Sequence, residues 1–123
     1  NLHRDWVWVR TNPFNSDGKY LITSSADGQA CIWDVKDGQA VKILKHPEPF
    51  YSVVTAMFSP DGQQALTAAG NDAYIWDVKT GQIVQTLKGH QDRIIHAEYS
   101  PDGKSIITTS ADFTAVLWRL KRD

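Results

Sequence analysis

The sequence lacks most of the features that quickly assign a chain to a functional class. Its single cysteine among 123 residues, Cys31, can form neither an internal disulfide nor a structural zinc site. No apolar run is longer than four residues, as in 6–9 and 115–118, so we predict no membrane-spanning helix and no signal-peptide core. With 13 Lys and Arg against 14 Asp and Glu, the net charge is -1 and provides no basic surface for nucleic acid or anionic lipid. We therefore expect neither nucleic acid nor a membrane as a partner.

Signals for a cofactor or a metal are also missing. The glycines stand singly in turn-like contexts and form no phosphate-binding loop, and the four histidines are too scattered to predict a metal site. Cys31, beside Ile32 and Trp33, is interpreted as a packed thiol and not a reactive one. With 41% hydrophobic and 22% charged residues, the composition is typical of a soluble domain from a reducing compartment. We expect no cofactor and a cytoplasmic location.

What the sequence does contain is a threefold internal repeat. Trp33, Trp76 and Trp118 close similar apolar segments at intervals of 43 and 42 residues. His3, His46 and His90 recur at intervals of 43 and 44 residues, and Asp-Gly pairs stand at 17–18, 61–62 and 102–103. Three independent landmarks that keep nearly the same interval indicate one structural unit repeated three times.

Each repeat consists of short segments that are typical of strands. These segments are rich in β-branched and aromatic residues and are separated by Gly, Asp, Asn and Pro; they are 20–24, 29–35 and 40–44 in the first repeat and 64–68, 73–78 and 82–87 in the second. No segment carries an apolar stripe of helical period over the length of a helix. We predict an all-β chain, a single domain over 1–123, made of three four-stranded antiparallel meanders at about 2–45, 46–89 and 90–120. The last meander lacks its outer strand.

These repeats resemble those of the tryptophan–aspartate (WD) repeat family. The resemblance covers about residues 2–120 and lies in Trp33-Asp34, Trp76-Asp77, Gly89-His90 and the Ser-Pro-Asp-Gly turns 59–62 and 100–103. The chain departs from the family pattern where Arg119 follows Trp118, where Lys45 precedes His46, and in the longer loops 12–16 and 47–51. The resemblance implies a β-propeller, in which four-stranded blades pack face to face around a central channel.

The family pattern also implies a polar network in every blade. The sets are His3, Thr23, Asp27 and Trp33; His46, Thr67, Asn71 and Trp76; and His90, Thr108, Asp112 and Trp118. In each set the turn residue would accept a hydrogen bond from the imidazole, the imidazole would reach the threonine hydroxyl, and the threonine would reach the indole N–H. An unpaired polar group buried between blades costs about 1–3 kcal/mol, so a closed network would lock the register of the blade.

Written as Thr, His and Asp, the same residues resemble a hydrolase triad, which is the alternative interpretation. Catalysis needs one such set in a cleft with an oxyanion hole, whereas this set recurs in every repeat and has no nucleophile elbow. In the second repeat Asn71 also stands where a triad needs an acid. We therefore expect a non-enzymatic protein, with an enzyme whose site lies at the channel mouth as the alternative.

Partner contacts are expected on the loops that lead into the innermost strand of each blade. Trp, Tyr and Arg are enriched among the residues that dominate interfaces. The candidates are Asp5, Trp6 and Trp8 in the first blade, Phe50 and Tyr51 in the second, and Arg93 and His96 in the third. For Trp6 and Trp8, filling of the space between blades is an equally good interpretation. The predicted function is a scaffold that presents these loops to a protein or peptide.

Three blades are fewer than the roughly four to eight of a closed propeller. Two apolar blade faces and the outer edge of the last blade would stay uncovered, and such surfaces drive association. We therefore expect that the chain is not a free monomer. The favoured interpretation is that it forms the last three blades of a larger propeller. The alternative is that two or three copies complete one ring.

Overall fold

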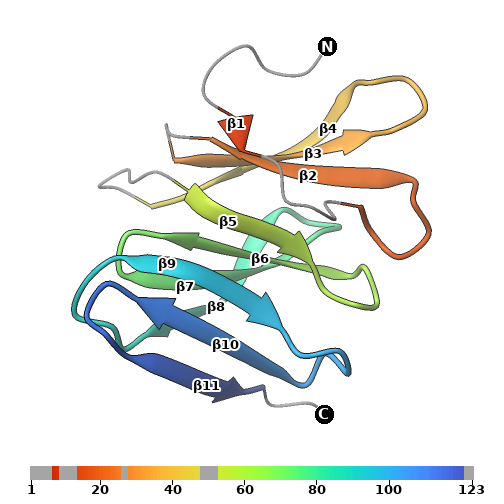
Figure 1. Ribbon diagram of the computed structural model, residues 1–123. Coiled ribbons are helices and arrows are strands. Elements are labelled where there is room, and N and C mark those ends of the chain that lie inside the picture. Colours follow the sequence, from red (N-terminus) through yellow and green to blue (C-terminus); the bar gives the residue numbers. More distant parts are fainter. Residues whose placement is uncertain (1–6, 9–13, 26–27, 48–52, 121–123) are drawn as a thin grey trace.

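Each repeat folds into one antiparallel sheet in which consecutive strands are neighbours. The structure is a computed structural model that describes residues 7–8, 14–25, 28–47 and 53–120, and this part of the chain contains eleven strands and no helix (Figure 1). The first sheet holds β1 (Val7–Trp8), β2 (Tyr20–Ser25), β3 (Gln29–Asp34) and β4 (Ala40–Lys45). The second holds β5 (Val53–Phe58), β6 (Gln64–Ala69), β7 (Asp72–Asp77) and β8 (Gln82–Lys88), and the third holds β9 (Ile94–Tyr99), β10 (Ser105–Ser110) and β11 (Ala115–Arg119).

The predicted all-β architecture of three blades, the last with three strands, is confirmed. The strand bounds differ from the prediction by about one residue. Val35 and Val78, predicted as strand ends, lie in the turns after β3 and β7, where each donates its backbone N–H to the residue that precedes β2 or β6. The apolar character of both valines had favoured the strand.

The Ser-Pro-Asp-Gly segments form the tight turns that join β5 to β6 and β9 to β10. Ser59 and Ser100 each donate the hydroxyl proton to the aspartate two residues on, at 2.6 Å in both turns. Gly62 and Gly103 follow with φ of 75° and 72°, a left-handed conformation in which a Cβ would be strained. The Ser hydroxyl pairing lowers the pKa of Asp102 below its usual value.

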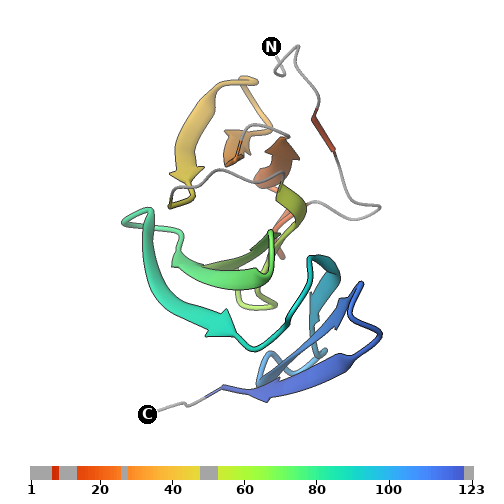
Figure 2. The same ribbon diagram turned by 90° about the vertical axis from the view of Figure 1, so that its left-hand side faces the viewer.

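The three sheets stack face to face, with the second sheet between the other two (Figures 1 and 2). Its two faces belong to two separate cores because side chains alternate along each strand. Ala65 and Trp76 pack with Ile22 and Ile32 of the first sheet, and Leu66 and Ile75 pack with Ile94 and Ile106 of the third. We call these contacts the first and the second seam.

The outer face of the third sheet has no neighbour among the described residues. Ile22, Leu66 and Ile107 each precede the repeated threonine, and Ile32, Ile75 and Leu117 each precede the repeated tryptophan. The residues of the first two sheets are at most 2% exposed, whereas Ile107 and Leu117 are 43% and 57% exposed. The sequence pattern that forms a seam is therefore repeated on a face where no further sheet is present.

The two ends of the stack differ in the connections that they carry. One end, the linker end, is where β2, β4, β6, β8 and β10 end and where β3, β5, β7, β9 and β11 begin. The other, the turn end, holds the turns β5–β6, β9–β10, β3–β4 and β7–β8. This alternation follows from the antiparallel order of the strands.

Candidate functional site

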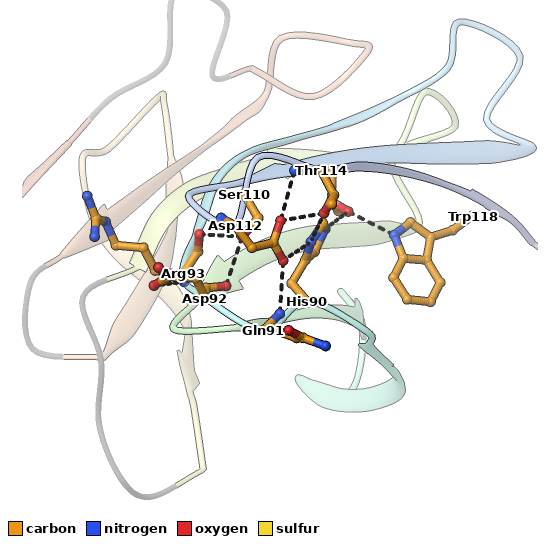
Figure 3. A network of polar contacts seen from close by, with 9 residues as sticks. His90, Gln91, Asp92, Arg93, Ser110, Asp112, Thr114 and Trp118 are labelled. Atoms are coloured by element: carbon orange, nitrogen blue, oxygen red, sulfur yellow. Dashed lines mark hydrogen bonds and ion pairs between the residues drawn. The ribbon is translucent and has the colours of Figure 1, made fainter.

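In the third sheet, His90, Thr108, Asp112 and Trp118 form one continuous hydrogen-bond network (Figure 3). The indole N–H of Trp118 donates to Thr108 Oγ1 at 2.9 Å, and Thr108 Oγ1 lies 2.7 Å from His90 Nε2. His90 Nδ1 lies 3.2 Å from Asp112 Oδ2. Three elements bring the four side chains together: the loop before β9, strand β10 with the turn after it, and strand β11.

Asp112, the carboxylate of this network, accepts several further hydrogen bonds. It accepts the backbone N–H groups of Gln91 and Thr114, each at 2.9 Å, as well as the hydroxyl of Thr114. These donors, with the Thr114 hydroxyl first, hold the pKa of Asp112 well below its usual range. The carboxylate therefore stays ionised and joins the loop before β9 to the β10–β11 turn.

In the second sheet the network takes a different path. Trp76 donates to Thr67 Oγ1 at 2.9 Å, and Thr67 Oγ1 lies 2.7 Å from His46 Nε2, as in the third sheet. His46 Nδ1, however, faces the carbonyl oxygen of Gly28 in the first sheet at 2.9 Å. Within the described residues Asn71 makes no hydrogen bond with His46 and its side chain is exposed, so the predicted contact between them is absent.

The turn lengths account for this difference. Trp76 stands nine positions after Thr67, whereas Trp118 stands ten positions after Thr108, so the β6–β7 turn is one residue shorter and ends before Asn71 can reach the imidazole. The spacing is visible in the sequence and would have served to predict the change. The substitute acceptor, the Gly28 backbone carbonyl, has no side-chain signal.

The tautomer of His46 follows from its two partners. Because a carbonyl oxygen can only accept, Nδ1 carries the proton that it donates to Gly28. A neutral imidazole with its proton on Nδ1 accepts at Nε2, so Thr67 donates its hydroxyl proton there while its oxygen accepts the indole N–H of Trp76. Burial lowers the pKa of His46 below its usual value, against the opposing effect of the Gly28 hydrogen bond. His46 is thus a neutral, fully paired side chain at the first seam.

In the first sheet Trp33 donates to Thr23 Oγ1 at 3.0 Å. The other two members of this predicted set, His3 and Asp27, lie outside the described residues. The same pairing of indole and threonine therefore occurs in all three sheets.

The candidate contact residues are described only in part. Arg93 and His96 are exposed, Arg93 directly before β9 at the linker end and His96 within β9, where its Nε2 lies 3.0 Å from Glu98 Oε1. The Arg93 side chain extends away from the polar network (Figure 3). Trp6, Phe50 and Tyr51 lie outside the described residues, as does the side chain of Trp8.

Two side chains that the sequence patterns did not predict as site residues shape the linker end. Ser110 donates its hydroxyl toward the carbonyl oxygens of Asp92 and Arg93, each at 3.0 Å, and so fixes the backbone that carries Arg93. Thr114 contacts both His90 and Asp112. A Ser-Ala-Asp sequence at 25–27 and 110–112 was the available signal for Ser110; Thr114 had none.

Among the described residues no three His, Cys, Asp or Glu side chains are grouped in a way that suits a metal ion. None of the described segments is a helix capable of crossing a lipid bilayer. Cys31 lies half-buried on β3.

Together, the fold and the repeated network define a protein built of propeller-type β blades. The family model described as "WD domain, G-beta repeat" matches residues 2–34, 38–77 and 81–119. The chain therefore belongs to the WD repeat family, whose members generally act as non-catalytic scaffolds for other proteins.

Several relatives share this repeat. An uncharacterised WD repeat-containing protein of Synechocystis is 34% identical over 103 residues, which cover 83% of this chain and 29% of the relative. The intraflagellar transport protein 122 homolog of Xenopus tropicalis is 39% identical over 70 residues, 57% of this chain and 6% of the relative. The rat target of rapamycin complex subunit LST8 is 30% identical over 108 residues, 80% of this chain and 32% of the relative. The chain spans about a third or less of each of these relatives.

Proposed function

We propose that this chain is a non-enzymatic scaffold that holds a protein or peptide partner at its linker end. The observation that carries the proposal is the burial of the repeated networks: Thr67 and Thr108 are both 0% exposed. Each hydroxyl oxygen is engaged by an indole on one side and an imidazole on the other, so no substrate can reach it as a nucleophile. This supports a structural role for the repeated His–Thr–Asp set over a catalytic one.

The proposed contact residues are Trp6, Trp8, Phe50, Tyr51, Arg93 and His96. Arg93 is exposed at a position that Ser110 fixes through backbone carbonyls, so it can bind a partner without first being ordered. Two relatives are named for an intraflagellar transport protein and for a subunit of a complex, which supports protein partners for this chain as well. The proposal includes a cytoplasmic location and no nucleic acid, membrane or cofactor as a partner.

The test is affinity purification with quantitative mass spectrometry on two matched variants. We expect that replacing Trp6, Tyr51 and Arg93 with alanine removes specific partners. A control that replaces Lys36, Lys79 and Lys104 at the turn end with alanine should retain them. If both variants retain the same partners, the contact surface does not lie at the linker end. Turnover of ester or peptide substrates that is lost in Thr108→Val would support the enzyme alternative instead.

The exposure of Ile107 and Leu117 on the third sheet favours a second proposal, which concerns assembly. We propose that another blade covers the outer face of the third sheet, because Ile107 and Leu117 repeat the residues that form the two seams. The blade comes either from the same protein or from further copies of this chain, two or three of which would close a ring. Multi-angle light scattering separates these sources: a discrete dimer or trimer supports copies, and a soluble 13.8 kDa monomer argues against both.

A further inference from the structure

The turn end carries a groove to which all three sheets contribute. Its lining comes from residues 14–18 before β2, residues 57–60 at the end of β5, and residues 98–101 at the end of β9. The groove has a volume of about 780 Å³, enough for a short peptide segment. It lies at the opposite end of the sheets from Arg93 and from the buried networks, and of the proposed contact residues only His96 reaches it, through Nε2 at 3.0 Å from Glu98 Oε1. We call it the turn-end groove.

The walls of this groove are held in place by their own hydrogen bonds. The hydroxyl of Ser59 accepts the N–H of Gln64 at 3.0 Å, and that of Ser100 accepts the N–H of Ser105 at 3.1 Å. On the first sheet the side-chain oxygen of Asn15 accepts the N–H of Tyr20 at 3.1 Å. A surface that is ordered before binding loses little conformational entropy when a ligand enters.

The floor of the groove is apolar. Phe14 is 45% exposed, Met57 is half-buried, and Phe58 and Tyr99 are buried behind them. A phenylalanine and a thioether that line one groove can each pack against an aromatic or aliphatic side chain of a ligand, because sulfur and ring edges make favourable contacts.

The charge of the lining has a single sign. Apart from Tyr99, its ionisable side chains are those of Asp17 and Glu98, which are both acidic and exposed. Asp17 belongs to the first repeat and Glu98 to the third sheet, so they lie on either side of the second sheet. One oxygen of each is already oriented: Asp17 Oδ1 accepts the N–H of Lys19 at 2.9 Å, and Glu98 Oε1 lies 3.0 Å from His96 Nε2. Two fixed carboxylates on either side of an apolar floor complement a ligand that carries cations around an apolar group.

We propose that the turn-end groove binds a short basic segment of a partner protein with one aromatic or aliphatic anchor residue. The anchor packs on Phe14 and Met57, and flanking lysines or arginines pair with Asp17 and Glu98. Because this groove lies at the other end of the sheets from Arg93, the chain can hold two partners, or two parts of one partner, at once.

Met57 supplies a direct test because it is the only methionine in the chain. Labelling with [methyl-13C]methionine places an NMR signal on the floor of the groove, which is assigned by its loss in Met57→Leu. The probes are three synthetic peptides, acetyl-AKFKA-amide, acetyl-AEFEA-amide and acetyl-AKAKA-amide. We expect a saturable shift of the Met57 signal with the first peptide, no saturable shift with the acidic peptide, and at least tenfold weaker binding of the peptide without the anchor.

Two variants separate this groove from the linker end. The double substitution Asp17→Asn and Glu98→Gln keeps an oxygen acceptor at both positions and should weaken binding of AKFKA about two- to fivefold, because both charge pairs are exposed. Arg93→Ala should leave the affinity unchanged.

The proposal fails if Met57 shows no saturable shift with AKFKA, or if the acidic peptide binds equally well. It also fails if the Met57 signal moves with protein concentration alone, because a second copy of the chain would then occupy the groove. A loss of AKFKA binding in Arg93→Ala, with none in the double variant, would place the peptide at the linker end and would likewise overturn it. None of these results depends on whether linker-end partners are found.

Discussion

Thr67 and Thr108 each serve two partners through one hydroxyl oxygen. In both cases the oxygen accepts an indole N–H and lies 2.7 Å from an imidazole nitrogen. Through these two hydrogen bonds each threonine joins the tryptophan of the next strand to the histidine that precedes the sheet. At the scale of the residue, the stability of a blade depends on this single oxygen.

Replacing Thr67 by valine tests this dependence. The change keeps the shape of the side chain but leaves the indole N–H of Trp76 and Nε2 of His46 unpaired in the first seam. We expect a loss of about 2–4 kcal/mol in the free energy of unfolding, measured by urea denaturation.

The matched control for this prediction is Thr86→Val, since Thr86 is an exposed residue of β8 in the same sheet. It should change the free energy of unfolding by less than about 0.5 kcal/mol. Equal costs for the two variants would show that the network does not stabilise the blade.

His46 gives the fold a specific dependence on pH. Its pKa in the folded state is lowered from about 6.5, which is also its value in the unfolded chain. The unfolded state therefore binds more protons between the two pKa values, so the free energy of unfolding increases with pH in that window. The stabilising contribution is complete above about pH 6.5 and is lost as the pH falls through the folded-state pKa.

We expect His46→Gln to flatten this slope when the free energy of unfolding is measured from pH 5 to pH 7.5. Thr86→Val, at an exposed residue that does not titrate, is the control and should leave the slope as in the wild type. A wild-type slope that persists in His46→Gln would mean that another group is responsible.

At the scale of the strand, the contribution of an apolar side chain to the free energy of unfolding depends on whether it points into a seam or into solvent. Ile75 on β7 is 2% exposed and packs in the second seam, whereas Val84 on the neighbouring β8 is 53% exposed. Val84 falls at the irregularity in the β7–β8 pairing, where Trp76 pairs with Ile83 and Ile75 pairs with Gln85. The extra residue in β8 turns an apolar side chain outward.

We therefore expect Ile75→Ala to reduce the free energy of unfolding by about 2–5 kcal/mol, because it leaves a cavity in the second seam. Val84→Ala should cost less than about 0.5 kcal/mol. Chemical denaturation of both variants measures the difference, and comparable losses would argue against the packing described for β7 and β8.

At the scale of the whole molecule, the repeated seam raises the question of what covers the third sheet. Each seam joins the outward face of one sheet to the inward face of the next, and the third sheet presents the same outward residues. If copies of the chain associate through this face, polar residues there should prevent association.

We expect Ile107→Thr with Leu117→Thr to shift the mass measured by light scattering to that of one chain. The control is Phe113→Asn: Phe113 is 99% exposed in the β10–β11 turn with φ of 70°, a conformation that asparagine tolerates. This control also removes a large exposed apolar side chain, but one that does not lie on the outer face of the third sheet. It should therefore leave the measured mass unchanged. Loss of association in the control variant alone would place the contact at the turn.

Much of the fold could be predicted because it depends on local patterns. The repeat interval, the Ser-Pro-Asp-Gly turns and the alternation of apolar residues determine strands and hairpins within about forty residues of chain. The candidate site was less predictable. The chain of hydrogen bonds at His90 followed the family pattern, but the partner of His46 did not, because a shorter turn moved Asn71 away and a backbone carbonyl from another sheet took its place.

The amino-acid sequence alone determined the three blades of this chain and the order of their strands, since these follow from the periods of the chain itself. Only the tertiary structure decided which polar atoms meet across the seams and which residues of three separate turns line one groove. Such contacts depend on the relative placement of sheets to within about an ångström, and no local pattern encodes that distance.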